Sequence, residues 1–247
     1  MMKISIITVT YNSAATVTDT LASVAKQSYQ NIEHIIVDGG SKDDTLNIVS
    51  TFKHIKKIIS EKDKGIYDAM NKGIELADGE IIGILNSDDF YADSLVIQNV
   101  MQVFEEENCA AVYGDLLYVD ADDITKIKRR WVSGNHTRTS FLYGWMPPHP
   151  AFFIRKSCYQ QFGKFNLQLG SAADYELMLR MIYRHEIKTA YLPKTLVHMR
   201  SGGVSNKNIQ NRLLANQNDR LAWEINGLNP FWFTLFLKPV RKIKQFI

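Results

Sequence analysis

Two groups of carboxylates stand where strands are expected to end. Asp38 follows the apolar run 32–37, and Asp88 with Asp89 follows the run 80–85, on what we expect to be a neighbouring strand. Ligands of parallel sheets bind beyond the carboxyl ends of the strands. A lone carboxylate such as Asp38 can accept hydrogen bonds from a ribose or a uracil N–H, whereas two adjacent carboxylates repel a diphosphate unless a divalent cation lies between them. Asp88 and Asp89 therefore predict Mg²⁺ or Mn²⁺ shared with donor phosphates.

The same residues allow other interpretations. A run of Asn, Ser and Asp suits a helix N-cap, so residues 86–89 could begin a helix, and Asp89 could do both. A dinucleotide-binding dehydrogenase could also place an acid such as Asp38 after its second strand. However, residues 10–14 (TYNSA) follow the first strand in place of a glycine-rich turn, and no P-loop motif occurs. NAD and P-loop chemistry are therefore not supported.

The elements that would position these residues follow from the spacing of apolar side chains. Strands are predicted at 3–10, 32–37, 57–60 and 80–85, alternating with helices at 14–26, 43–52 and 66–77. This order predicts an α/β fold with a mostly parallel sheet between helices. Beyond about residue 105 the pattern is looser, with strands at 111–119 and 195–199 and helices at 174–184 and 208–226.

Composition and charge limit the class of protein. A chain of 247 residues with 45% hydrophobic and 22% charged residues is typical of one ordinary globular domain. Cys109 and Cys158 lack metal or redox spacing, so we expect reduced thiols in a cytoplasmic protein, and the immediate start of a strand leaves no room for a signal peptide. Four basic residues in the last ten leave a net charge of −1 on the remainder. We expect no nucleic-acid partner.

Five segments together resemble the family 2 glycosyltransferases of the GT-A fold. They are residues 8–12, 38–41 with Asp44, 63–73 (DKGIYDAMNKG), 79–80 and 85–89. The resemblance spans about residues 2–205 and is closest to bacterial enzymes of O-antigen, capsule or exopolysaccharide assembly. It implies a Rossmann-like GT-A domain at 1–228, with a nucleotide-binding half at 1–105 and an acceptor-binding half at 106–228. It also implies a UDP-sugar donor, transfer of a hexose or N-acetylhexosamine, inversion at the anomeric carbon and a metal at a DxD-type motif.

The resemblance also assigns individual residues. The donor-binding set it implies is Thr10, Asn12, Asp38, Asp63, Asn71, Asp88 and Asp89. Asp89 would bind the metal directly, joined by His198, for which an ordinary half-buried strand histidine is the alternative. Trp145 and His149 lie in a segment that resembles the acceptor side of the site, where the Trp145 ring could stack on a sugar or belong to the core.

Inversion by direct displacement needs a carboxylate that takes the proton of the acceptor hydroxyl. Asp174 matches the second acid of the family's Glu-Asp catalytic motif, but Ala173 stands where the first acid is usual. An N-cap role is the alternative for Asp174, and Glu176, two residues along a helix, should point elsewhere. Arg200 precedes the glycines of segment 201–205 and could close over the diphosphate.

Residues 229–247 form an amphipathic basic tail. The apolar run 231–237 is too short to span a bilayer, and Lys238, Arg241, Lys242 and Lys244 follow it. Such a segment suits the headgroup region of an anionic leaflet, so we expect peripheral contact with the inner face of the cytoplasmic membrane. A polyprenyl-diphosphate-linked glycan acceptor would make this contact useful. Packing of the tail against the domain or at a dimer contact is the alternative.

Two rival functions remain at this point. A glycoside hydrolase needs two carboxylates beside the scissile bond and neither a nucleotide nor a metal site, so metal dependence separates it from a transferase. A catalytically weak GT-A-like domain that binds nucleotide or glycan without turnover is the second, and Ala173 keeps it open.

Overall fold

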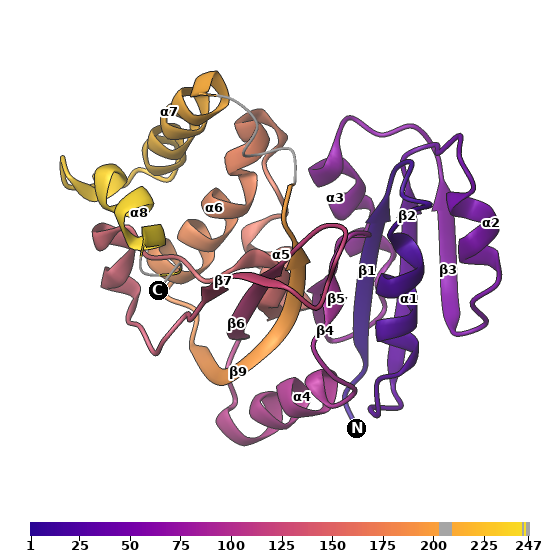
Figure 1. Cartoon of the computed structure of the whole chain (residues 1–247). Coiled ribbons are helices and arrows are strands. Elements are labelled where there is room, and N and C mark those ends of the chain that lie inside the picture. Colours follow the sequence, from indigo (N-terminus) through magenta and orange to yellow (C-terminus); the bar gives the residue numbers. More distant parts are fainter. Residues whose placement is uncertain (203–208, 244, 246–247) are drawn as a thin grey trace.

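The fold is a central sheet with helices on both faces (Figure 1). The computed structural model describes residues 1–202, 209–243 and 245. Within them, nine strands form one sheet in the order β3-β2-β1-β4-β8-β6-β9-β5, with β7 paired to β6. The strands are β1 Ile4–Thr10, β2 Ile32–Asp38, β3 Ile55–Ser60, β4 Ile81–Ile84, β5 Phe90–Tyr91, β6 Ala111–Val119, β7 Ile127–Trp131, β8 Phe152–Arg155 and β9 Thr189–Arg200.

Helices connect and cover these strands. The α-helices are α1 Val17–Ala25, α2 Thr45–Ser50, α3 Ile66–Leu76, α4 Val96–Glu107, α5 Lys156–Phe162, α6 Ala173–Met178, α7 Ile209–Ile225 and α8 Thr234–Ile243. Short 3₁₀ segments lie at η1 Arg138–Tyr143, η2 His149–Ala151 and η3 Leu167–Ala172, and the π-helical η4 Leu179–Arg184 continues α6.

The expectation of a mostly parallel sheet holds for the first half of the chain only. Strands β3, β2, β1 and β4 are parallel neighbours, whereas β8 is antiparallel to both β4 and β6, and β5 and β7 are also antiparallel additions. Strands β6 and β9 form the remaining parallel pair. The sheet is therefore mixed, and its four neighbouring parallel strands all belong to the N-terminal part of the chain.

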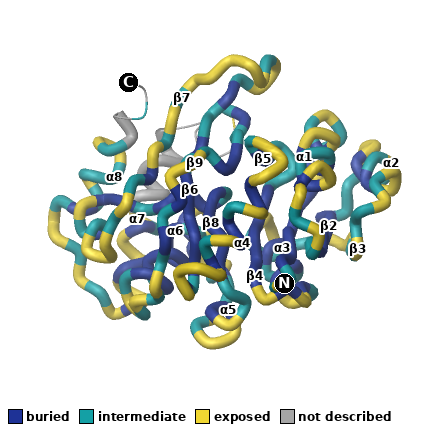
Figure 2. The backbone as a smooth tube through the Cα atoms, turned by 90° about the horizontal axis from the view of Figure 1, so that it is seen from below, coloured by how far each residue is buried: buried dark blue, intermediate teal, exposed yellow. Residues whose placement is uncertain are grey.

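Successive side chains of the strands contribute to two hydrophobic layers on opposite faces of the sheet, because side chains alternate between the two faces along a strand. Ile7 and Val9 of β1 face α3 and the later helices α5 and α6, whereas Ile4 and Ile6 face α1 and α4. The central strands are buried and the connections between them are exposed (Figure 2). This packing fixes the strand ends where the polar residues of the site lie.

The tail packs against the domain through one of its sides. The Thr234 hydroxyl donates a hydrogen bond to the Leu142 carbonyl at 2.7 Å, and the Lys238 ammonium lies 2.7 Å from the Asp219 carboxylate. Packing against the domain, the alternative interpretation of the tail, is therefore correct for this side. Among the described residues no helix is both long enough and apolar enough to cross a bilayer. Lys244 lies outside the described residues.

Candidate active site

The predicted carboxylates do lie at one edge of the sheet, but not on neighbouring strands. Strand β1 lies between β2, which ends at Asp38, and β4, which leads to Asp88 and Asp89. Thr10 at the end of β1 pairs with Asp38 in the register of the two strands. The expectation that the strands before Asp38 and before Asp88 are neighbours was wrong, because β1 (residues 4–10) pairs in parallel with β4 (residues 81–84) and so lies between β2 and β4.

Asp38 organises the loop after β2. It is fully buried and accepts hydrogen bonds from the hydroxyls of Thr10, Ser41 and Ser60 and from the amides of Gly40 and Ser41, at 2.5–3.1 Å. Burial alone would raise the pKa of the carboxyl, but these hydrogen bonds hold it below the usual value. Both oxygens are occupied, so in this structure Asp38 has no free surface for a uracil or a ribose. The expected direct contact would require this network to open.

Thr10 and Asn12 also hold loops together. The Thr10 hydroxyl donates to Asp38 at 2.9 Å. Asn12 adopts a positive φ of 49°, which asparagine tolerates better than most residues. Its side-chain oxygen accepts from the Lys42 amide at 2.9 Å, and its backbone amide donates to the Ser41 hydroxyl at 2.8 Å. Both residues therefore hold the loops at this edge of the sheet, and their expected contact with a donor stays a prediction.

Asp63 and Tyr11 are the accessible groups at this edge. Asp63 accepts a hydrogen bond from the Gly65 amide at 2.8 Å with one carboxylate oxygen. Its other oxygen lies against Gly39, where an added Cβ would approach it to 2.5 Å, and the Tyr11 ring lies on the same side. Tyr11 is 63% exposed. The sequence interpretation singled out Asp63 but not Tyr11, although an aromatic residue directly after a strand end is a recognisable signal for ring stacking.

Asn71 is bound to the backbone of Phe165. Its side-chain amide donates to the Phe165 carbonyl at 2.9 Å, and its side-chain oxygen accepts from the Phe165 amide at 2.9 Å. Both polar ends of the side chain therefore have a structural role in this structure, and the expected donor contact stays a prediction. Through Phe165, this clamp supports the ring contacts of Tyr67 and His149, whose centroids lie 5.2 and 5.4 Å from that of Phe165.

Replacing Asn71 with alanine should lower stability. Loss of two partly buried hydrogen bonds is expected to reduce the free energy of unfolding by about 2 kcal/mol, and hence the melting temperature by roughly 6 °C. Differential scanning calorimetry measures this. Asn47→Ala, which removes only an exposed hydrogen bond to Asp44, serves as control and should leave the melting temperature unchanged. Equal melting temperatures for the two variants would contradict the clamp.

Asp88 and Asp89 lie in a turn, not at a helix N-cap. The Asp89 amide donates to the Asn86 carbonyl at 3.1 Å, and strand β5 follows directly at Phe90. Helix α4 begins only at Val96, after Leu95 as N-cap. The N-cap alternative for residues 86–89 was therefore wrong, because no helix begins at this turn.

Asp89 combines full burial with an unused oxygen. Its Oδ2 accepts from the Asn86 amide at 3.2 Å, and among the described residues no donor reaches Asp89 Oδ1 or Asn86 Oδ1 with normal hydrogen-bond geometry. Burial and then the charge of Asp88 raise the pKa of Asp89 well above its usual value, although Asn86 and Arg200 oppose this. Burial also raises the pKa of Asp88. A buried carboxylate of this kind is costly unless it is paired or binds a cation.

These oxygens fit a hard divalent cation. Mg²⁺ and Mn²⁺ prefer oxygen ligands, and Mg²⁺ is commonly held by one or two carboxylates together with substrate phosphates rather than by a complete protein cage. Within the part of the chain that the structure describes, no three His, Cys, Asp or Glu side chains form a group that could hold a metal. The two unused oxygens of Asn86 and Asp89 therefore suit an ion whose other ligands come from a bound diphosphate.

His198 lies on β9 opposite Phe90 of β5, and the two rings make an edge-to-face contact with centroids 5.2 Å apart. Burial lowers the pKa of His198, and Asp93 opposes that shift. A neutral imidazole can bind a metal, so the assignment of His198 as a metal ligand stays a prediction. In this structure His198 contacts the Phe90 ring and is influenced by the charge of Asp93.

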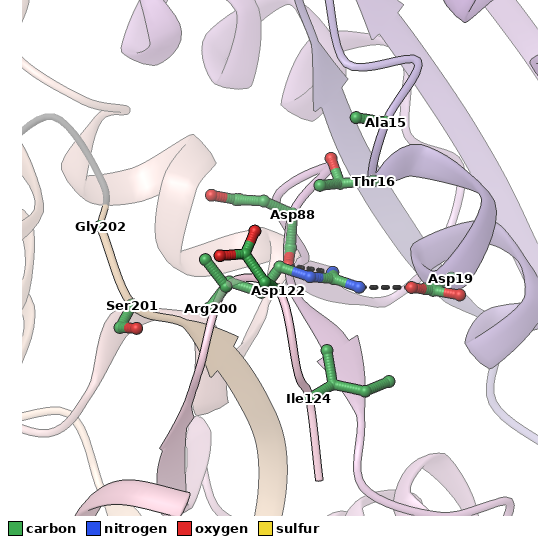
Figure 3. A pocket seen from close by; sticks show the side chains of 10 residues that line it. Ala15, Thr16, Asp19, Asp88, Asp122, Ile124, Arg200, Ser201 and Gly202 are labelled. Atoms are coloured by element: carbon green, nitrogen blue, oxygen red, sulfur yellow. Dashed lines mark hydrogen bonds and ion pairs between the residues drawn. The ribbon is translucent and has the colours of Figure 1, made fainter. Parts of the chain in front are cut away.

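Arg200 is held in place by the protein. Its guanidinium donates to the Asp88 carbonyl at 2.7 Å and to the Asp19 carboxylate (Figure 3). It also lies over the Phe90 ring, 5.3 Å from its centroid. It lines a pocket of about 680 Å³ together with Asp88, Thr16 and Asp122. Two of the Arg200 N–H groups are thus engaged by the protein, and its expected role in closing over a diphosphate stays a prediction. Residues 203–205 of the same predicted loop lie outside the described residues.

Asp174 is the second residue of α6, whose N-cap is Ala172, so the N-cap alternative for Asp174 was wrong. Its carboxylate accepts a hydrogen bond from the Tyr175 amide at 2.7 Å. Burial and then the charge of Asp174 raise the pKa of Tyr67. His149 is buried; burial lowers its pKa, and the charge of Asp174 opposes the shift. The charge of Asp174 therefore acts on both Tyr67 and His149.

Tyr118 of β6 lies under Arg129 of β7, whose guanidinium stacks over the Tyr118 ring at 3.7 Å from its centroid. Burial raises the pKa of Tyr118, Arg129 opposes this, and the charges of Asp89 and Asp174 add to the rise. The two carboxylates therefore belong to the same electrostatic environment, although they lie far apart in the sequence.

Trp145 and Glu176 belong to the scaffold. Trp145 is only 4% exposed, donates to the Ser133 carbonyl at 3.0 Å and packs against Tyr113 and Phe141, so the core alternative is correct and its ring is not available to a sugar. Glu176 forms a buried ion pair with Arg180 at 2.7 Å. Its carboxylate is therefore engaged by Arg180, and the expectation that it points elsewhere than Asp174 stays a prediction.

Comparison with known sequences gives a consistent result. Residues 5–164 match the profile described as "Glycosyl transferase family 2". The chain is 30% identical over 216 residues to the "PGL/p-HBAD biosynthesis glycosyltransferase" of Mycobacterium bovis (strain BCG / Pasteur 1173P2), a match that covers 85% of this chain and 82% of the relative.

Known structures match the same fold. Staphylococcus aureus TarS 1-349 in complex with UDP-GlcNAc has a TM-score of 0.74 at 20% identity, covering 96% of this chain and 69% of that 1-349 chain. The mannosyltransferase PcManGT from Pyrobaculum calidifontis, in complex with GDP-Man and Mn²⁺, has a TM-score of 0.68 at 18% identity, covering 96% and 68%. At these identities the matches establish a GT-A-like fold.

Proposed function

The chain belongs to glycosyl transferase family 2, and on that premise we propose that it transfers a hexose or N-acetylhexosamine from a UDP-sugar to a glycan acceptor with inversion. The observation that carries this proposal is the contrast between two carboxylates. Asp89 is buried with an unused oxygen, whereas Asp174 is half-buried and accepts a hydrogen bond from the Tyr175 amide, so the two suit different tasks. Different environments for two acids are a common basis for a division of catalytic roles.

The donor would lie along the strand ends from Tyr11 to Asp89. The exposed Tyr11 ring and the accessible Asp63 carboxylate offer stacking and hydrogen bonds to a nucleoside. Asp38 and Asn12 would act indirectly by fixing the loops beneath it. A UDP-sugar is the proposed donor because the structural neighbour TarS binds UDP-GlcNAc.

Asp89, with Asn86 beside it, would hold Mg²⁺ or Mn²⁺ through the unused oxygens, and His198 remains a further candidate ligand. When bound, the cation would supply positive charge that stabilises the departing diphosphate. The Mn²⁺ complex of the neighbouring mannosyltransferase supports this choice of ion.

Asp174 would take the proton from the acceptor hydroxyl as its oxygen attacks the anomeric carbon. The new carbon–oxygen bond forms on the face opposite the nucleotide, the bond from the anomeric carbon to the diphosphate breaks, and its electron pair leaves with UDP. Tyr67 would orient the Asp174 carboxylate through its hydroxyl, and His149 would support it from the buried side. A donor with an α-linked hexose should therefore give a β-linked product.

The acceptor is proposed to be a glycan carried on a lipid such as a polyprenyl diphosphate, at the inner face of the cytoplasmic membrane. The basic tail next to the α6 region supports such an acceptor. The pathway of bacterial surface polysaccharide assembly is consistent with the family.

UDP release from a panel of UDP-sugars, measured with Mn²⁺ or with EDTA and a lipid-diphosphate sugar acceptor, tests the proposal. Metal-dependent release from one donor supports it and identifies the sugar. Release that is equal in EDTA would contradict the metal site. Tight, metal-dependent UDP binding without turnover of any donor across an acceptor panel would instead favour a binding domain.

Tyr67→Phe isolates the orienting role of the Tyr67 hydroxyl. Loss of one hydrogen bond to a charged group should lower kcat about tenfold, with the KM for the donor unchanged because Tyr67 is not among the groups proposed to touch the nucleotide. Steady-state kinetics measure both parameters. Tyr183→Phe, on the π-helical segment η4, is the matched control and should retain full activity. A changed donor KM with an unchanged kcat would contradict this role.

A further inference from the structure

The tail and the adjoining segment η1 expose a cluster of aromatic side chains. Tyr143, Phe231 and Phe233 form neighbouring ring pairs with centroids 5.2–6.4 Å apart, and Trp232 contacts Phe233 at 5.6 Å. Trp232 is 82% exposed and Phe236 is 63% exposed. A single exposed apolar residue needs no explanation, but a contiguous aromatic group of this kind usually marks an interaction surface.

Helix α8 presents this surface because its opposite side is fixed to the domain. Thr234 and Lys238, four residues apart, bind Leu142 and Asp219, respectively. Phe236 and Val240, also four residues apart, are exposed, as expected for the other side of the same helix. The α8 backbone lies close to Gly144, where an added Cβ would approach the Lys238 amide to 2.5 Å. The apolar side therefore faces outward while the helix stays attached.

The charge of the same segment indicates the chemistry of the partner. From Lys238 to the end of the sequence there are four basic residues and no acidic residue. Lys238 is paired with Asp219, and Arg241 donates to the Tyr143 carbonyl at 3.4 Å, at the margin of the aromatic cluster. Tryptophan and tyrosine with adjacent basic residues suit the boundary between acyl chains and anionic headgroups.

This surface is connected to the proposed reaction centre. The Lys238 ammonium lies 3.7 Å from the centroid of the Tyr175 ring, and Tyr175 follows Asp174 on α6. Helix α8 lies at the end of the molecule away from β3, in both views of the chain (Figures 1 and 2). A bilayer that contacts α8 would thus lie on the side of the chain that carries the proposed base.

We propose that Tyr143, Phe231, Trp232, Phe236 and Val240 form a surface that binds an anionic lipid bilayer and brings a lipid-linked acceptor to the half of the domain that carries Asp174. Only the delivery of a lipid-linked acceptor rests on the proposed function; the binding of a bilayer does not. The partner is the bilayer itself, because the exposed aromatic side chains lie beside Arg241, and Lys242 and Lys244 follow it in the sequence. A second copy that used the same surface in a symmetric contact would place the basic residues of both copies against each other.

The test is co-sedimentation of the full chain with vesicles of phosphatidylglycerol or of phosphatidylcholine, without donor or acceptor. We expect binding to the anionic vesicles, weaker binding to the neutral ones, and at least about a tenfold loss of partitioning in the double variant Trp232→Ser, Phe236→Ser. The matched control Ile58→Ser, Leu95→Ser removes two similarly exposed apolar residues of β3 and the start of α4 and should bind as the wild type does. Unchanged partitioning of the tail variant, or no binding by the wild type, would overturn the proposal.

Two further readouts distinguish a membrane-binding surface from a dimer contact and from a defect in catalysis. Light scattering that shows a wild-type dimer, dissociated by the tail substitutions, would assign the surface to a second copy and overturn the proposal. Turnover of a water-soluble acceptor should be equal in the wild type and the tail variant, whereas turnover of a vesicle-bound lipid acceptor should fall with binding. Vesicle binding by a chain that transfers no sugar would refute the proposed function but leave the membrane surface intact.

Discussion

Replacing Asp174 with asparagine is expected to lower kcat by about a thousandfold, because the amide cannot take the proton of the acceptor hydroxyl. The substitution preserves size and the ability to accept from the Tyr175 amide, so α6 should remain folded. The affinity for UDP should be unchanged, since Asp174 is proposed to act on the acceptor. Steady-state kinetics and isothermal titration with UDP and Mn²⁺ measure the two effects separately.

Asp122→Asn is the matched control for this experiment. Asp122 is an exposed carboxylate in the connection between β6 and β7 and lines the pocket beside Arg200. Its substitution should leave kcat unchanged. If Asp174→Asn retained kcat within a few fold of the wild type, another group would have to be the base, and the assignment based on family resemblance would fail.

Asp89→Asn is expected to abolish the stabilisation of the folded protein by Mn²⁺. It should also lower turnover at least about a hundredfold, which is the usual effect of losing a group that stabilises charge developing in the transition state. In the absence of metal the same variant should be more stable than the wild type, because it removes a buried carboxylate whose Oδ1 accepts no hydrogen bond from the described residues. Melting temperatures with EDTA and with Mn²⁺ measure both effects. Loss of activity combined with lower metal-free stability would instead indicate a merely structural role for Asp89.

The pH dependence of metal-free stability has a defined sign. The pKa of Asp89 is higher in the folded state than in the unfolded state. At a pH between these two pKa values, the folded state therefore binds more protons than the unfolded state. Stability contributed by this group is therefore present at low pH and is lost as the pH rises through the folded pKa. Asp89→Asn should remove this part of the dependence, and Mn²⁺ should reduce it. Unfolding by urea across this pH range, with Asp122→Asn as control, provides the measurement.

The first half of the fold was predictable because its strands are short and apolar and its helices are amphipathic. Strand β2 was placed within one residue, and α3 likewise. Helix α4 was not predicted, although the buried apolar residues Val96, Val100 and Phe104 stand four residues apart, which is a helical spacing that the sequence does contain. The two-residue β5 and the strongly charged β7 carry no such signal, since they owe their conformation to pairing with β9 and β6.

The site was predictable in outline but not in the roles of its members. Asp38 and Asp89 both follow strands in the sequence, yet one accepts five hydrogen bonds and the other leaves an oxygen unused. Asn71 was assigned to the donor site by the family resemblance, and its partner Phe165, 94 residues away, could not be foreseen from the local sequence. Such partners are set by tertiary packing, which local patterns do not encode. Tyr67 and Tyr118 were missed for the same reason.

The anomeric configuration of the product tests the central claim most directly. The wild-type protein with Mn²⁺, an α-linked UDP-hexose and a lipid-diphosphate sugar acceptor should yield a β-linked product, readable from the proton coupling at the anomeric carbon by nuclear magnetic resonance. This result would agree with a single displacement in which Asp174 deprotonates the attacking hydroxyl. An α-linked product would contradict that mechanism, because it requires retention and a different use of the carboxylates at Asp89 and Asp174.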